Sequence, residues 1–404
     1  MKSVNPELLV PAGDMEKVEA ALHFGADAVY LGGEAFGLRS QAGNFSLAEL
    51  RRAVDMCHAA NCRLYLTLNA CLLPGNQTDL TGYLEELRPL AIDAYIVADP
   101  GVLSLVRQLD PQRPLHLSTQ ANTTNAAAVN FWRSQGVERV NLARELSLDE
   151  IRLIRRDTDL DLEVFVHGAM CMAYSGRCLL SAGMAGRSAN QGNCAHPCRW
   201  SYALVEAQRP GEYYPIEQDE RGSYVMNSRD LCLIEYLPSL LEAGVGSLKI
   251  EGRMKGCYYV AAVTRVYRQA LDRYRDDPAA FTVDPLWLEE LDKVSHRPYG
   301  TGFLFADGDP KIYRQDSVYQ RTSDFVGVVL EKKAGQGLVA GRNRFFPGEE
   351  LEVFGPQLRQ ETLVVGRLTG PEGEPLAVMQ PNGRGWLDLP DWTRPGDMLR
   401  RSLR

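Results

Sequence analysis

The chain has 404 residues, of which 45% are hydrophobic and 24% charged, and its formal net charge is −8. This is the composition of a globular protein, and it excludes a wholly disordered chain, a collagen and a strongly basic coat for nucleic acid. No run of roughly 18 apolar residues indicates a membrane span. The first residues lack the apolar core of a secretion signal, so we expect a cytoplasmic protein with no membrane partner.

The first 275 residues alternate between short apolar runs and amphipathic stretches. The runs are rich in β-branched and aromatic residues and too short for helices, so they predict eight strands. Amphipathic stretches such as Met15–Phe24 and Leu47–Ala59 lie between them, and Ser46 followed by Glu49 predicts a helix capping box. Eight β-then-α units predict a (β/α)8 barrel of the TIM type over residues 1–275. The predicted strands cover residues 8–10, 28–31, 64–68, 94–97, 115–118, 140–142, 164–166 and 248–250.

The regular spacing is broken between the seventh and eighth predicted strands, where about eighty residues intervene. This insertion, about residues 168–245, leaves the C-terminal face of the barrel, where the active sites of such barrels are built. Residues 276–315 contain several prolines and glycines and are predicted to be a connector. Residues 316–404 contain short apolar runs separated by Gly, Pro and Asn turns, which predicts a small all-β barrel or sandwich. Its clearest predicted strands are residues 325–330, 337–340, 351–354 and 363–365.

Five of the nine cysteines lie in or beside the insertion. In a reducing compartment, grouped thiols point to metal or catalysis rather than to disulfides. Their spacing is not the CxxC pair of structural zinc, and loosely spaced cysteines at a barrel mouth better suit a [4Fe–4S] cluster. The other four lie in helix or strand patterns and are expected to be ordinary buried side chains. Cys232 lies near the start of an expected helix. The cysteines in or beside the insertion are Cys171, Cys178, Cys194, Cys198 and Cys232, and those expected to be buried are Cys57, Cys62, Cys71 and Cys257.

Several segments resemble the signature of the collagenase-like peptidase family. The longest is EVFVHGAMCMAYSGRCLLS at residues 163–181. Within that family the chain is most similar to the prephenate-dependent tRNA uridine hydroxylases, on the basis of FVGVVL at residues 325–330 and RNRFFPGE at residues 342–349. The other matching segments are ELLVPAG (7–13), ADAVYLGG (26–33), NQGNC (190–194), CRW (198–200), MNSRDLC (226–232) and SLKIEGR (247–253).

The resemblance implies an enzyme that hydroxylates a wobble uridine of tRNA at carbon 5, giving 5-hydroxyuridine. It also implies a [4Fe–4S] cluster and prephenate as cosubstrate. The partners would be a tRNA anticodon stem-loop, a small dicarboxylate and the iron–sulfur assembly machinery. Carried onto this chain, the four-cysteine motif falls on Cys171, Cys178, Cys194 and Cys232, with Cys198 as the alternative fourth ligand.

Polar residues directly after the predicted strands should line the mouth of the barrel. We expect four of them, around the seventh and eighth strands, to be catalytic. Because a dicarboxylate calls for the paired donors of arginine, we expect others to bind substrate. The catalytic set is His167, Lys249, Glu251 and Arg253, and the substrate-binding set is Arg39, Asn69, Gln120, Asn122 and Arg144.

Two basic segments indicate where tRNA could bind. Residues 251–275 hold six Lys or Arg against two acids, and residues 394–404 hold four Arg against one Asp. Three other functions stay open: a peptidase, a hydroxylase of rRNA cytidine or of a quinone, and a non-catalytic iron–sulfur scaffold. The peptidase is the least expected of these activities, because the chain has no HExxH zinc motif and no GxSxG elbow.

Overall fold

The computed structural model divides the chain into two units. The first consists of the residues up to Val18, Asp27–Met254 and His296–Tyr319, and the second of Glu19–Ala26, Lys255–Ser295 and the residues from Gln320 onward. The structure describes residues 6–38, 43–171, 173–200, 204–205, 213–214, 218–219, 222–223, 229–305, 319–333 and 335–403.

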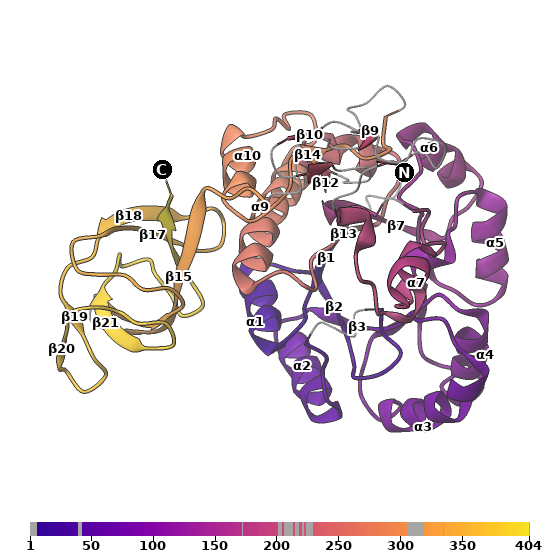
Figure 1. Ribbon diagram of the computed structural model, residues 1–404, viewed down its shortest axis with the longest axis horizontal. Helices are drawn as coiled ribbons and strands as arrows, with labels where there is room; N and C mark the ends of the chain where they lie inside the picture. Colours follow the sequence, from indigo (N-terminus) through magenta and orange to yellow (C-terminus); the bar gives the residue numbers. More distant parts are fainter. Residues whose placement is uncertain are drawn as a thin grey trace. The chain divides into compact units, whose positions relative to one another are not determined.

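The first unit is built on a closed barrel of eight parallel strands. Each strand from β1 to β7 pairs with the next one along the chain, and β13 closes the ring by pairing with both β7 and β1. The ribbon in Figure 1 shows this ring with helices α2 to α6 around its outside. The predicted barrel and all eight predicted strands are thus confirmed. The strands are β1 (Glu7–Pro11), β2 (Ala28–Gly32), β3 (Arg63–Leu68), β4 (Ala94–Val97), β5 (Leu115–Leu117), β6 (Arg139–Asn141), β7 (Asp161–Ala169) and β13 (Ser247–Ile250).

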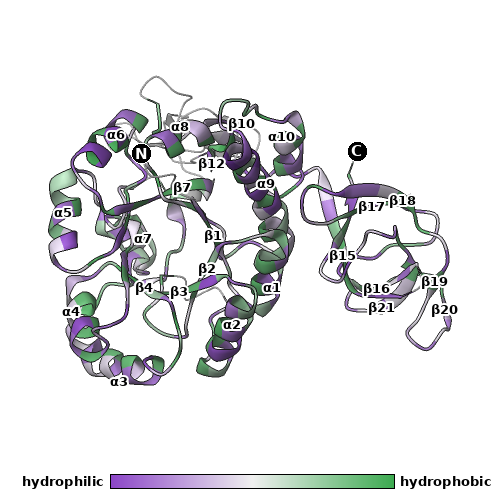
Figure 2. Cartoon of the chain, turned by 180° about the vertical axis from the view of Figure 1, so that it is seen from behind, coloured by the Kyte–Doolittle hydropathy of each residue, from purple (hydrophilic) through white to green (hydrophobic). Residues whose placement is uncertain are grey.

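The outer helices follow from local sequence signals. Ser46 and Glu49 form the predicted capping box at the start of α2, and Ser147 with Glu150 forms another at the start of α6. Hydrophobic and hydrophilic residues alternate along α2, α3 and α4 (Figure 2), as expected for helices with one buried face. None of the described helices is both long and apolar enough to cross a membrane. The helices are α1 (Met15–Phe24), α2 (Leu47–Ala59), α3 (Gln77–Leu87), α4 (Pro100–Leu109), α5 (Ala126–Ser134), α6 (Leu148–Arg156) and α8 (Leu237–Glu242).

The insertion after β7 contains helix α7 (Leu180–Ala185) and the short strands β8 to β12. Strand β12 (Asp230–Cys232) runs antiparallel to the end of β7, and β14 (Tyr299–Gly300) pairs with its other side. Cys232 therefore ends a strand, and a 3-10 helix (Ile234–Tyr236) and then α8 follow it directly, so the expectation that it lies near a helix start is confirmed. The buried ion pair of Asp230 with Arg297 (2.6 Å) holds β12 in the sheet. The remaining strands are β8 (Leu204–Val205), β9 (Tyr213–Tyr214), β10 (Gln218–Asp219) and β11 (Gly222–Ser223).

The second unit contains helices α9 (Cys257–Asp276) and α10 (Pro285–Asp292) and an antiparallel sheet of eight strands. The sheet order is β18-β17-β22-β15-β16-β21-β19-β20, and no pairing joins the edge strands β18 and β20 among the described residues. The all-β domain and its four clearest strands are confirmed. They are β15 (Ser323–Lys333), β16 (Gln336–Gly341), β17 (Glu350–Phe354), β18 (Gln360–Val364), β19 (Leu368–Thr369), β20 (Pro375–Leu376), β21 (Arg384–Asp388) and β22 (Met398–Ser402).

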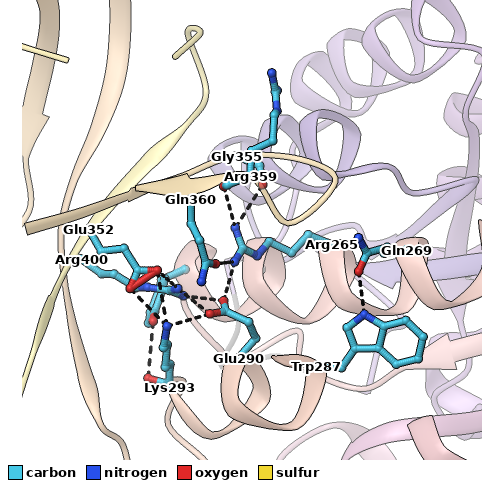
Figure 3. A network of polar contacts seen from close by, with 11 residues as sticks. Arg265, Gln269, Trp287, Glu290, Lys293, Glu352, Gly355, Arg359, Gln360 and Arg400 are labelled. Atoms are coloured by element: carbon cyan, nitrogen blue, oxygen red, sulfur yellow. Dashed lines mark hydrogen bonds and ion pairs between the residues drawn. The ribbon is translucent and has the colours of Figure 1, made fainter. Parts of the chain in front are cut away.

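A buried network of charged side chains joins α9, α10 and this sheet (Figure 3). The Glu290 carboxylate accepts hydrogen bonds from Arg265 (2.5 Å), from both terminal nitrogens of Arg400 (2.7 and 2.8 Å) and from Lys293 (2.7 Å). Arg400 also binds Glu352 (2.5 Å). Because of these contacts α9 and α10 belong to the unit of the β sheet. Residues 276–315 are accordingly not a separate connector: their first part holds α10, and their last part adds β14 to the barrel sheet.

Candidate active site at the barrel mouth

The C-terminal ends of the barrel strands surround a cavity, which we call the mouth cavity. It combines fixed charges with neutral hydrogen-bonding groups. Six residues that the sequence predicted for the site line it: Lys249, Glu251, Arg253, Asn69, Gln120 and Arg144. The remaining lining residues are Tyr30, Leu38, Thr67, Ser118, Thr119, Asn141 and Phe165.

Lys249 is held in the barrel interior at the base of this cavity. Its ammonium lies 2.9 Å from a carboxylate oxygen of Glu163 and 4.4 Å from the centre of the Tyr30 ring. Lys249 and Glu163 are both buried. A buried lysine needs such a partner to stay charged, so the pair fixes a cation beneath whatever occupies the cavity.

The charges continue below Lys249 through the interior of the barrel. Arg139 binds Glu7 directly and lies 3.7 Å from Glu163, and the Tyr65 hydroxyl donates to Glu7 (2.7 Å). Burial and the Glu7 charge raise the pKa of Tyr65, so its hydroxyl stays protonated. Burial lowers the pKa of nearby His116 well below its usual value, and Arg139 adds to this, so that imidazole is neutral. This polar column makes the floor of the site rigid.

Arg144 reaches the cavity from the loop after β6. It donates to the Ala169 carbonyl (3.0 Å) and to the Glu251 carboxylate (3.3 Å), and its guanidinium carbon lies 3.8 Å from the centre of the Phe165 ring. Its Nε–H is buried and has no hydrogen-bond partner among the described residues. Glu251 therefore orients Arg144, and the guanidinium keeps N–H groups that these two contacts do not use.

Arg253 is the most tightly confined cation of the site. It is 3% exposed, and its terminal nitrogens donate to Thr67 Oγ1 (3.3 Å) and Asn44 Oδ1 (3.0 Å). A Cβ on Gly32 would lie only 2.3 Å from Nη2 of Arg253, so this guanidinium position requires glycine at residue 32. A planar guanidinium held in this way is suited to bind a carboxylate.

Two predicted site residues within the described ranges do not line the mouth cavity. His167 is buried in β7, where its Nε2 lies 3.4 Å from the Tyr299 hydroxyl and its backbone is opposite Cys232. Asn122 closes a short turn in a left-handed conformation with φ of 55°. Arg39 lies outside the described residues.

Sequence reasoning missed the inward-facing residues within the strands. Thr67 lies in β3 two residues before Asn69, and Tyr30 lies two residues before Gly32 in β2. The alternation of strand side chains between the two faces would have assigned Thr67 to the same face as Asn69.

The five cysteines of the insertion region form no disulfide among the described residues, and each is exposed or half-buried. Their chemistry suits an iron–sulfur cluster. Their arrangement does not, because no three Cys, His, Asp or Glu side chains are placed to hold a metal ion anywhere in the described ranges. We therefore assign no chemical step to a cluster. Of the other four cysteines, Cys71 is exposed and not buried as expected.

The two basic segments predicted to bind tRNA are largely engaged in internal ion pairs. On α9, Arg265 is buried against Glu290, and Arg273 pairs with Asp284 (2.8 Å). In the C-terminal segment Arg400 is also buried against Glu290. The charges of Arg265, Arg273 and Arg400 are thus compensated by ion pairs within the second unit, and tRNA binding by the two segments stays a prediction.

Comparison with known proteins agrees with the resemblance found in the sequence. The chain matches the profile of peptidase family U32 over residues 13–313 and that of the family's C-terminal domain over residues 321–400. It is 40% identical to tRNA hydroxylation protein P1 of Bacillus subtilis, over 98% of this chain and 94% of that protein. It is 37% identical to tRNA hydroxylation protein P of Escherichia coli, over 95% and 94% of the two chains.

A further relative carries a different name. The 23S rRNA 5-hydroxycytidine C2501 synthase of Escherichia coli is 39% identical over 66% of this chain, which corresponds to 39% of that protein. The profile match covers most of the chain, and relatives at this identity cover nearly all of it. The predicted resemblance is thus confirmed, and the chain belongs to peptidase family U32.

Proposed function

We propose that this protein is a cytoplasmic tRNA-modifying enzyme that hydroxylates a wobble uridine at carbon 5, with prephenate as cosubstrate. The observation that carries the proposal is the similarity over nearly the full chain to proteins named for tRNA hydroxylation. Stacking in a helix covers both faces of the uracil ring, so we expect the enzyme to act at carbon 5 of an unpaired or extruded base. An anticodon loop supplies such a base at low energetic cost.

The geometry of the mouth cavity supports a small dicarboxylate as cosubstrate. Arg253 and Arg144 would bind its carboxylates, and Lys249 would add positive potential beneath them. Glu251 would orient Arg144 through their 3.3 Å contact. These residues bind and position; the proposal assigns the transfer of oxygen to none of them.

The same cavity gives no support to peptide hydrolysis. A peptidase of the acyl-transfer type needs a nucleophile with an adjacent base. The described lining residues include no cysteine and no histidine, and the hydroxyl of Ser118 contacts Asn69 (3.2 Å) and not a base.

A [4Fe–4S] cluster bound by Cys171, Cys178, Cys194 and Cys232 is part of the proposal, with delivery by the iron–sulfur assembly machinery. The insertion would have to rearrange to bring these thiols together. Anaerobic reconstitution, followed by iron and sulfide counts, tests this. Loss of the cluster in Cys171→Ala and in Cys178→Ala is expected, and full loading of either variant would contradict the ligand set. Cys232→Ala compared with Cys198→Ala in the same assay identifies the fourth ligand.

The function is tested by the nucleosides of tRNA from cells with and without this protein. We expect 5-hydroxyuridine-derived nucleosides to disappear on deletion, in a strain without a paralogue, and to return with the wild-type gene. An Arg253→Met variant should fail to restore them, whereas Arg152→Met, which changes an exposed arginine on α6, should restore them. Unchanged tRNA nucleosides after deletion would refute the proposal.

Hydroxylation of an rRNA cytidine is the second candidate, favoured by the similarity to the 23S rRNA synthase. The two candidates differ in one measurable product. Digestion of the rRNA from the same two strains decides between them, because loss of 5-hydroxycytidine from rRNA with intact tRNA would support the second candidate alone.

A further inference from the structure

A second cavity adjoins the mouth cavity, and we propose that it binds the target nucleobase of the RNA. It has a volume of about 310 Å³ and shares Leu38, Asn69 and Gln120 with the mouth cavity. We call it the base pocket. The inference rests on the proposed function and assigns the two substrates to separate compartments.

The walls of the base pocket suit a pyrimidine. Trp132 of α5 supplies an aromatic surface, and Pro100 and Ala121 supply apolar ones. Asn190 and Gln120 bring amide groups, which can donate to and accept from the edge of a base. Proteins that hold an unpaired base combine such stacking surfaces with hydrogen bonds to its edge.

The charges of the base pocket differ from those of the mouth cavity. Its one lining carboxylate among the described residues, Asp99, is occupied as a helix cap: it accepts from the backbone of Gly101 (2.7 Å), Val102 (3.3 Å) and Leu72 (3.2 Å). Its lining cation, Arg177, is exposed. We therefore expect a small dicarboxylate to bind in the mouth cavity. A neutral base with its flanking phosphates would bind in the base pocket.

The insertion that forms one wall of the base pocket has the charge expected of a surface facing RNA. No Asp or Glu occurs between Glu163 and Glu206, whereas this interval contains Arg177, Arg187 and Arg199. The whole chain holds 52 acids in 404 residues, so an acid-free interval of this length is a local departure. Absence of acids near a polyanion removes repulsion, and each arginine adds attraction.

The wall is seated firmly on the barrel. Gly176 has φ of +74°, and a Cβ there would lie 1.9 Å from the Gln120 carbonyl oxygen. Beside it, the backbone amide of Ser175 donates to Glu145 (3.0 Å), and the amide of Cys71 donates to the Asn190 carbonyl (3.0 Å). The base pocket is thus open in the present arrangement of the insertion, and a base within it would face the mouth cavity past Asn69 and Gln120.

The experiment measures binding and photo-crosslinking of an anticodon stem-loop RNA to the full-length protein. The RNA carries 5-iodouridine at the wobble position. We expect the crosslink to map to the peptide containing Trp132. We also expect Trp132→Ala to weaken binding roughly 10- to 100-fold, because base–aromatic stacking is lost. Trp132→Phe should retain most of the affinity, which separates stacking from misfolding.

One control variant changes a neighbouring residue on α5, and a second variant tests the contribution of the lining arginine. Phe131 is the exposed neighbour of Trp132 and does not line the base pocket, so Phe131→Ala should bind like wild type. Arg177→Ala should reduce the salt dependence of binding by about one unit of slope. Wild-type binding by Trp132→Ala, or a crosslink outside the lining residues of the base pocket, overturns the inference.

Failure of this inference is distinguishable from failure of the proposed function. If the protein is not a tRNA hydroxylase, wild type and all variants give the same tRNA nucleosides in the deletion strain. If it is one but the base lies elsewhere, wild type restores the nucleosides and Trp132→Ala restores them equally well.

Discussion

Removing the Glu290 carboxylate should destabilise the second unit more than any other single change to the network in Figure 3. Glu290 is fully buried, and so are the two arginines that bind it, Arg265 and Arg400. Glu290→Ala would leave these two cations buried without their shared anion. Breaking a buried ion pair from one side costs about 3–5 kcal/mol, and that is the loss in the free energy of unfolding that we expect.

The lowered pKa of Glu290 gives a similar value for the loss in the free energy of unfolding. Burial alone would raise the pKa of its carboxyl, but the charges of Arg265 and Arg400 outweigh burial and lower that pKa to about 2. Against an ordinary value of 4.5 the difference corresponds to about 3 kcal/mol. Because the folded pKa is lowered, this stabilisation is fully present above pH 4.5 and is lost as the pH falls toward 2.

Hydrogen exchange with mass spectrometry can locate the effect, because a global melt would mix the two units. In Glu290→Ala, peptides of α9, α10 and β22 should exchange much faster, and peptides of β1–β6 should not. The matched control is Glu352→Ala, which removes a carboxylate from the same network at a position 21% exposed and should cost about 1 kcal/mol. Equal destabilisation by the two variants would refute the reasoning.

Two further predictions concern the barrel. Gly32→Ala should abolish tRNA hydroxylation, because the added Cβ would displace the Arg253 guanidinium. Gly82→Ala on α3, where no atom lies within 4 Å of the added Cβ, should instead raise the free energy of unfolding by about 0.5–1 kcal/mol. Nucleoside analysis and urea unfolding of both variants check these outcomes. His116 is buried and neutral because burial lowers its pKa. The unfolded chain binds that proton near pH 6.5, so barrel stability should fall as the pH drops below about 6.5, and a flat profile between about pH 7 and 5.5 would contradict this assignment.

The regular part of the fold follows from local sequence signals. Each barrel strand is buried on both faces, so its apolar run is nearly continuous and easy to find. The capping box of Ser46 and Glu49 marks the start of α2 at the predicted residue. The class of the C-terminal domain also follows, because its turns are marked by Gly, Pro and Asn.

The parts that the sequence did not predict depend on contacts between distant residues. Strand β12 is held by Arg297, 67 residues away from Asp230, and no local pattern reports such a pair. Arg265 and Arg273 made α9 look more basic than it is, because their acidic partners, Glu290 and Asp284, lie outside that helix. Charge counted along the chain measures composition, whereas a binding surface depends on which charges are compensated in space.

The three cations of the mouth cavity also differ in how their charges are compensated in space. Lys249 and Arg253 were predicted to be catalytic and Arg144 to bind substrate, and the fold gives each cation a different setting. Lys249 faces Glu163, Arg144 faces Glu251, and Arg253 donates to the neutral oxygens of Thr67 and Asn44. A ligand carboxylate would therefore meet three fixed cations whose orientations are set before it arrives. Preorganised donors of this kind bind without the cost of ordering flexible side chains. The acid-free insertion beside these fixed cations suits the proposed pairing of a small acid with a large RNA, because it adds no carboxylate that would repel either one.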